Sequence, residues 1–240
     1  EAIAADTSAT EVARRFERND WISAPVVDDD GKLLGRITID DVVDVIREEA
    51  DHSLTSLAGL AEEDTFATVW HSAPRRAVWL GVNLGTALLA SSVINLFQDT
   101  IEKVVALAVL MPIVASMGGI AGTQSLTILI RAMAMGQINH RNELWLIGRE
   151  SLVALLNGLL WAAVIATTTS LWFGDWMLGV IIACAMLINL LTAGVTGAGL
   201  PIVLRKLQID PALAGGVLVT TVTDVVGFLA FLGLATAFYA

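Results

Sequence analysis

Long apolar segments fill the chain after residue 76. Five of them reach roughly the 20 residues that a helix needs to cross a lipid bilayer. They cover residues 77–97, 104–134, 151–173, 176–203 and 212–239. Charged residues within these segments are few, so the pattern predicts five membrane-spanning helices rather than a soluble core.

The second apolar segment is too long for a straight span and contains Pro112 and a glycine-rich stretch at residues 116–125. Two interpretations fit this stretch. The helix is tilted, broken or extended beyond the bilayer, and unwound carbonyls in it can coordinate a cation. Alternatively, the glycines form a groove in which helices pack closely.

In the first 50 residues the apolar segments are shorter and indicate short helices and strands. Ser8 and Glu11 form a capping-box pattern ahead of an apolar helical face. Residues 24–27 and 33–38 have the composition of short strands, and the acidic residues between them indicate a turn. With a second helix after them, the expected order is helix, strand, turn, strand, helix.

Thr38 and Asp41 can cap that second helix. We therefore expect an α/β segment at residues 1–50, a linker or connecting helix at 51–76, and a five-span membrane domain at 77–240. The expected fold class is a mainly α membrane protein with a small α/β segment at its N-terminus. The chain begins without Met inside the α/β segment, so we expect it to be part of a longer protein.

Charge is distributed unevenly. Residues 1–70 carry 17 of the 24 acidic residues and 6 of the 14 Lys/Arg, a net charge of −11, whereas the rest of the chain carries a net +1. An acidic head disfavours nucleic acid as a partner, because phosphates repel it, and it suits cations or a basic partner. The sequence contains one cysteine, scattered histidines and no familiar catalytic motif, so we expect no enzyme.

Basic residues predict the orientation of the spans. Only Lys103 falls opposite the acidic head; seven basic residues fall on its side, namely Arg75, Arg76, Arg131, Arg141, Arg149, Arg205 and Lys206. Because cytoplasmic loops are rich in Lys and Arg, we expect a cytoplasmic N-terminus and an external C-terminus. The polar start of the chain is not a signal peptide pattern, and the expected location is the inner or plasma membrane.

One acidic residue, Asp224, lies near the middle of the last span. A carboxylate at this depth is costly and must face the bundle interior, a partner or water, as a cation ligand or a proton carrier. The alternative is a protonated acid that hydrogen-bonds a neighbouring helix. Thr220 and Gly227 lie one turn either side of it, and Thr221 and Thr223 supply further hydroxyls.

Three buried amides, Asn83, Asn157 and Asn189, are expected to form hydrogen bonds between helices. Glu150 and Arg149 begin the third span and are expected to pair or to reach the membrane surface.

Several motifs in the spans resemble the MgtE-type magnesium transporter or channel family. They are Met117-Gly118-Gly119, Gly122-Thr123-Gln124-Ser125, Asp210-Pro211-Ala212 and Thr220-Thr221-Val222-Thr223-Asp224. Residues 5–50 resemble most of a cystathionine-β-synthase-type (CBS) module, through residues 24–28 and 35–41. Two positions depart from the family pattern: Ile120 stands where Asn is usual, and Val217 where Pro is usual.

The resemblance implies a homodimer in the bilayer with one pore between the subunits, lined by the second and fifth spans. It implies a pore ion site formed by Asp224, Thr220, Thr223 and Gly227. The further pore-lining residues that it implies are Gly118, Gly119, Gly122, Thr123, Gln124 and Thr221.

The resemblance also implies regulation by the head. Glu48 and Glu49 match acidic positions where intracellular Mg²⁺ binds and closes the pore, so Mg²⁺ is both substrate and regulatory ligand. Asp41 matches a CBS position that can contact the ribose of an adenine nucleotide.

The sequence thus predicts a divalent-cation channel or transporter, with Mg²⁺ as the expected ion. Mg²⁺ dehydrates reluctantly and is usually held by one or two carboxylates and by waters, which fits one Asp224 from each subunit. Two alternatives stay open: a proton- or sodium-coupled transporter that uses Asp224 as its coupling carboxylate, and a membrane-bound sensor without transport.

Overall fold

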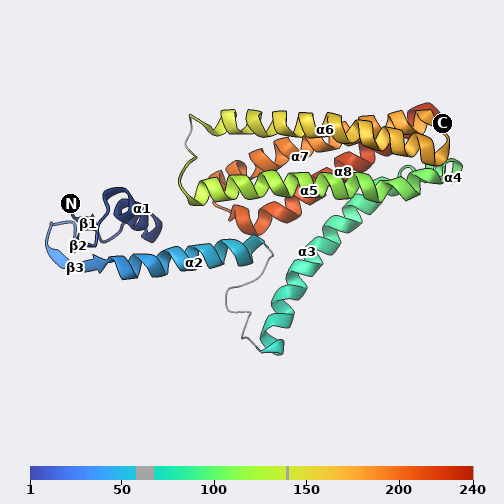
Figure 1. Ribbon diagram of the computed structural model, residues 1–240. Helices are drawn as coiled ribbons and strands as arrows, with labels where there is room; N and C mark the ends of the chain where they lie inside the picture. The colour runs from blue at the N-terminus through green and yellow to red at the C-terminus, as the bar shows by residue number, and fades with distance from the viewer. Residues whose placement is uncertain (58–67, 139–140, 240) are drawn as a thin grey trace. The chain divides into compact units, whose positions relative to one another are not determined.

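The computed structural model describes residues 1–57, 68–138 and 141–239 (Figure 1). Within α2, the side chains of residues 49–54, 56 and 57 lie outside this description. The chain forms two compact units, Glu1–Thr68 and Val69–Ala240.

The first unit is a small α/β fold. Its elements are β1 (Ile3–Ala4), α1 (Ala9–Asn19), β2 (Ser23–Val27), β3 (Leu33–Thr38) and α2 (Ile39–Leu57). The strands form one sheet in the order β1-β2-β3, with β1 parallel and β3 antiparallel to β2. The helices bury an apolar core against this sheet that includes Ile3, Phe16 and Val42. The sequence pattern did not predict β1, because two residues are too few to show a period.

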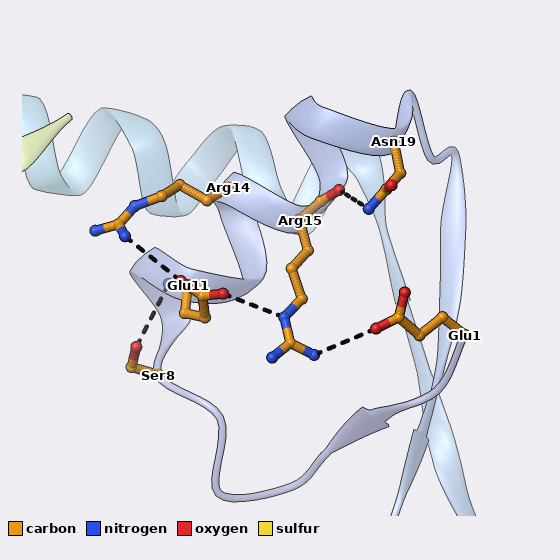
Figure 2. A network of polar contacts seen from close by, with 6 residues as sticks. All are labelled: Glu1, Ser8, Glu11, Arg14, Arg15 and Asn19. Carbon is orange, nitrogen blue, oxygen red and sulfur yellow. Dashed lines mark hydrogen bonds and ion pairs between the residues drawn. The ribbon is translucent and has the colours of Figure 1, made fainter. Parts of the chain in front are cut away.

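The start of α1 has the expected N-cap at Ser8, which is one half of a capping box. Ser8 Oγ accepts the backbone N–H of Glu11 at 3.4 Å. Figure 2 shows the Glu11 carboxylate turned toward the guanidinium groups of Arg15, at 3.3 Å, and Arg14, at 3.5 Å. These ion pairs are partly exposed and are each worth about 1 kcal/mol or less, so they mark the start of the helix rather than supply its stability.

The second unit is a bundle of long helices. Its elements are α3 (Val69–Asn95), the short α4 (Gln98–Lys103), α5 (Ala106–Ala134), α6 (Glu143–Phe173), α7 (Trp176–Lys206) and α8 (Pro211–Tyr239). Among the described residues, five of these helices are long and apolar enough to span a membrane. The expected fold class, a mainly α membrane protein with a small α/β segment, is confirmed.

Helix α7 lies at the centre of the bundle. It packs against α5, α6 and α8, whereas α3 packs against α8 (Figure 1). In the most apolar stretch of each helix, 56% of α7 is buried inside the structure but only 11% of α3. Helix α3 begins at Val69, inside the segment expected to be a linker, so Arg75 and Arg76 lie in its first turns.

Helix α5 is continuous through the glycine-rich stretch, so the interpretation of a broken helix was wrong. The second interpretation, close packing of helices, agrees with the structure. A Cβ on Gly197 of α7 would lie 2.5 Å from the carbonyl oxygen of Gly122 on α5. Glycine costs a helix about 1 kcal/mol relative to Ala, and this close approach offsets the cost. The 29 residues extend over about 44 Å, more than the roughly 30 Å hydrocarbon layer.

Candidate functional site: a groove on helices α5 and α8

Asp224 lines a groove of about 860 Å³, and the walls of this groove come from α5 and α8. Asp224 itself is half-buried. The groove is lined by Ala115, Ser116, Gly119, Ile120, Thr123, Gln124, Thr127 and Ile128 of α5 and by Thr220 and Asp224 of α8. Five residues proposed from the sequence thus share one groove, although about 100 positions separate the two helices.

The threonine hydroxyls of the groove donate their protons to their own helices. Thr123 Oγ1 donates to the Gly119 carbonyl at 2.8 Å, and Thr220 Oγ1 donates to the carbonyls of Gly216 and Val217 at 3.0 Å. A hydroxyl oxygen also carries two acceptor lone pairs. These oxygens are therefore suited to accept hydrogen bonds from the waters around a cation.

The other residues proposed for the site lie elsewhere. Thr223 is fully buried, and its hydroxyl donates to the Thr220 carbonyl at 3.0 Å. Thr221 donates to the Val217 carbonyl at 2.6 Å and is not part of the groove lining. Gly118, Gly122 and Gly227 are buried in helix contacts; they position the walls rather than line them.

Asn189 of α7 is inserted directly behind the groove. It is fully buried, and its Nδ2 donates to the Val114 carbonyl of α5 at 2.8 Å. A Cβ on Gly118 would overlap this amide, and one on Gly227 would lie 2.7 Å from Nδ2. The expected interhelical bond of Asn189 is confirmed. The same expectation was wrong for Asn83 and Asn157, which are exposed and bond carbonyls of their own helices.

Two other acids of the membrane unit are buried and paired. Glu143, 7% exposed, is in ion-pair contact with Arg205 and Lys206 at 3.2 and 3.3 Å. Glu150, 3% exposed, accepts a hydrogen bond from Ser125 Oγ at 3.0 Å and pairs with Arg149 at 2.8 Å. Within the described part of the chain, no three His, Cys, Asp or Glu side chains come together as a metal site.

In the first unit, Asp41 lines a small hollow of about 220 Å³ together with Thr7, Val12 and Val45. The backbone N–H and the hydroxyl of Thr38 both donate to its carboxylate at 2.9 Å and hold the Asp41 pKa below its ordinary value. These bonds confirm the predicted cap of α2. Glu48 is exposed on α2, and the Glu49 side chain lies outside the described residues.

A bundle of five long apolar helices, with a carboxylate in a groove between two of them, defines a multi-pass membrane protein. A family model described as divalent cation transporter (MgtE) matches residues 111–234, and a CBS domain model matches residues 2–48. The chain belongs to the MgtE family of divalent cation transporters.

Three curated relatives carry the name magnesium transporter MgtE. The protein of Bacillus subtilis (strain 168) is 38% identical over 229 residues, which cover 95% of this chain and 51% of the relative. That of Thermus thermophilus is 33% identical over 239 residues (97% and 52%), and that of Enterococcus faecalis is 32% identical over 228 residues (95% and 50%). The chain spans about half the length of these relatives.

Proposed function

We propose that this chain forms the pore of a divalent-cation channel or transporter, with Mg²⁺ as its ion. The observation that carries the proposal is Asp224, half-buried in a groove with the hydroxyls of Thr123 and Thr220. A carboxylate and hydroxyl oxygens can hold a hydrated Mg²⁺ through its waters. Binding through water is weak enough to let the ion leave again. The family match and the names of the relatives support the same ion.

The pore is formed by two copies of the chain. Only α5 and α8 wall the groove, and Asp224 is its only acid among the described residues. A second copy related by a two-fold axis closes the open side and adds a second Asp224. Two carboxylates then match the charge of one divalent cation.

The acidic head faces the cytoplasm and the C-terminus lies outside, in the plasma membrane. The positive-inside rule supports this orientation, because Lys103 alone lies at the opposite end of the spans. Cation entry is then driven by the membrane potential, which contributes about 2.3 kcal/mol per charge at 100 mV.

Flux through reconstituted vesicles tests the proposal. Asp224→Ala is expected to abolish Mg²⁺ flux while the protein still elutes as a folded species. Asp99→Ala removes an exposed acid of α4 and is the matched control, with flux retained. Undiminished flux in Asp224→Ala would remove Asp224 from the pathway.

Two other functions make different predictions in the same vesicles. A coupled transporter with Asp224 as its coupling carboxylate would respond to an imposed proton or Na⁺ gradient, whereas a channel follows the Mg²⁺ gradient and the membrane potential. A sensor would show no flux in any gradient and would still bind its ligand.

Mg²⁺ at the acidic head closes the pore in this proposal. Residues 1–70 carry a net charge of −11, and a cation that relieves this repulsion favours a compact, closed state. Neutralising Glu48 and Glu49 is expected to weaken Mg²⁺-dependent protection from proteolysis. The double variant of Glu17→Gln with Asp44→Asn changes the net charge equally and should keep that protection. Equal protection in both double variants would exclude Glu48 and Glu49.

The hollow beside Asp41 supports a second ligand, an adenine nucleotide held through its ribose. Asp41→Asn keeps much of the side-chain shape but removes its charge, and it is expected to weaken the binding of a fluorescent ADP analogue. Asp28→Asn, in the turn between the strands, should leave that binding unchanged.

A further inference from the structure

A second hollow lies between α5, α6 and α7, and its volume is about 380 Å³. It shares three residues of α5, Ile120, Gln124 and Ile128, with the Asp224 groove. Among the residues that line it, the one acid is Glu150. Membrane helices seldom bury an ionisable side chain without a use for it, and the proposed pore does not use this one.

Neutral polar side chains share the hollow with the Glu150 carboxylate. Ser125 Oγ lies 3.0 Å from Glu150 Oε2, and the amides of Gln124 and Asn157 line the same hollow. Asn157 Nδ2 donates to the Val153 carbonyl at 3.1 Å, so its amide oxygen is the atom left for the hollow. The hollow thus offers one carboxylate, one hydroxyl and two side-chain amides, whose oxygen atoms suit alkali and alkaline-earth cations.

The Glu150 carboxylate forms an ion pair with Arg149, whose side chain is about half exposed. Its guanidinium lies 2.8 Å from Glu150 Oε1, but its side chain is 51% exposed while that of Glu150 is 4% exposed. A long basic side chain near a helix end can withdraw to the membrane surface. The carboxylate has no such freedom, and a bare buried charge is strongly unfavourable. When Arg149 leaves, the carboxylate must take up a proton or accept another cation.

We propose that this hollow is a second cation site, in which a monovalent ion of about the size of Na⁺ exchanges with the Arg149 guanidinium on Glu150. One buried carboxylate balances one positive charge, so a divalent ion would leave an uncompensated charge in the hollow. The Glu143 carboxylate is not available to add a second charge, because Arg205 and Lys206 hold it.

The site adjoins the groove through α5. Ser125, which bonds Glu150, lies two positions from Thr123 and next to Gln124 in the groove. Replacing Arg149 by an ion therefore changes the contacts of a wall of the groove. This consequence for flux rests on the proposed function, whereas the site itself does not.

Thermal unfolding of the purified full chain tests the site without any flux measurement. Midpoints are compared in NaCl, KCl and choline chloride at equal ionic strength, with divalent ions removed. Na⁺ is expected to raise the midpoint saturably above the choline value. Glu150→Gln keeps the shape and the Ser125 bond but should abolish the Na⁺-specific rise. Arg149→Gln removes the competing charge and should lower the half-saturating Na⁺ concentration about tenfold or more.

Two controls separate this site from the pore. Asp224→Asn should keep the Na⁺ response, and so should Glu102→Gln, which neutralises an exposed acid of α4. If Glu150→Gln does not fold, Asn157→Leu serves instead and should weaken the response. A rise that choline gives equally, or that persists in Glu150→Gln, would overturn the site. A Glu150-dependent rise with Mg²⁺ but not with Na⁺ would overturn the assignment to a monovalent ion.

Discussion

At the scale of single residues, the groove depends on one amide and two glycines. Asn189 bonds the Val114 carbonyl of α5, and the missing Cβ atoms of Gly118 and Gly227 make room for it. Its Oδ1 is buried without a hydrogen-bond partner among the described residues. The amide thus bonds α5 and packs closely against α8, the two helices that carry the groove residues.

A double-mutant cycle tests this contact. Gly118→Ala forces a methyl group into the Asn189 amide, and such overpacking costs about 1–3 kcal/mol. Asn189→Ala removes the bond and leaves a cavity, at a cost of about 1–3 kcal/mol. With both changes the alanine methyl occupies the space of the amide, so the double variant is expected to be more stable than the two single costs predict. Reversible unfolding in mild denaturant measures the three free energies.

The control is Gly148→Ala, because nothing lies within 4 Å of a Cβ at that position. This change should be neutral or slightly stabilising, since Ala is favoured over Gly in a helix by about 1 kcal/mol. Strictly additive costs at Gly118 and Asn189 would contradict the contact.

Residue chemistry was predictable where it followed from local sequence. An acid in the middle of an apolar helix stands out without any structure, and so do the threonines one turn away. The exposed Ile120, at 56%, lines the groove at the position where the family usually has Asn. Ile120 therefore contributes an apolar side chain to the groove. The hydrogen bond between Ser125 and Glu150 joins residues 25 positions apart. No local sequence pattern predicts this bond.

At the scale of elements, Tyr239 and Asp175 join the end of α8 to the start of α7. Asp175 accepts the backbone N–H groups of Met177 and Leu178 as the N-cap of α7, and the Tyr239 hydroxyl donates to its other oxygen at 2.5 Å. The tyrosine bond, opposed by burial, lowers the Asp175 pKa below its ordinary value of 3.8. The ionised form is therefore the one that the fold stabilises.

Removing the tyrosine hydroxyl should weaken this connection. Because Asp175 is half-exposed, Tyr239→Phe is expected to cost about 1 kcal/mol at neutral pH. A carboxylate whose folded pKa is depressed contributes its stability above the unfolded pKa, and the contribution is lost as the pH falls through the folded value. The difference between the two proteins should therefore persist at pH 5–7 and shrink below about pH 3.8.

Unfolding midpoints across this pH range provide the measurement. Phe238→Leu changes an exposed neighbour, 59% accessible, and should show no such pH-dependent difference. A cost for Tyr239→Phe that is constant down to pH 2 would show that the hydroxyl acts independently of the Asp175 charge.

The elements themselves were largely predictable, because apolar length and capping residues are local signals. All five spans and the helix caps at Ser8 and Thr38 followed from the sequence. The break in α5 did not exist, because the glycines that suggested it are compensated by α7 and α8 packing against them. Strand β1 exists only as a partner of β2.

At the scale of the whole molecule, the proposed pore needs a second copy. Cys184 is the only cysteine in the sequence and is exposed, so Cys184→Ser gives a cysteine-free chain. Ile120→Cys in that background places one thiol in the groove. A short thiol-reactive cross-linker is expected to give a covalent dimer in membranes, because in the proposed dimer the two grooves face each other across the two-fold axis.

Leu160→Cys is the matched control. It is 58% exposed on α6 and lines neither hollow, so it should remain largely monomeric under the same treatment. Equal cross-linking at both positions would indicate random collision. Its absence at Ile120→Cys, with native mass measurements showing a monomer, would contradict the dimeric pore.

The sequence by itself determined the membrane class of this protein, its five spans, its acidic head and the position of Asp224 along the last span. Hydropathy, charge and capping are properties of neighbouring residues, so they can be recognised without a fold. The tertiary structure decided which face each residue occupies. It placed Thr123 and Gln124 beside Asp224, used Gly118 and Gly227 for packing against Asn189, and enclosed Glu150 in a second hollow. These outcomes depend on how helices far apart in the sequence pack, and helix packing is set by the shapes of all the side chains in contact.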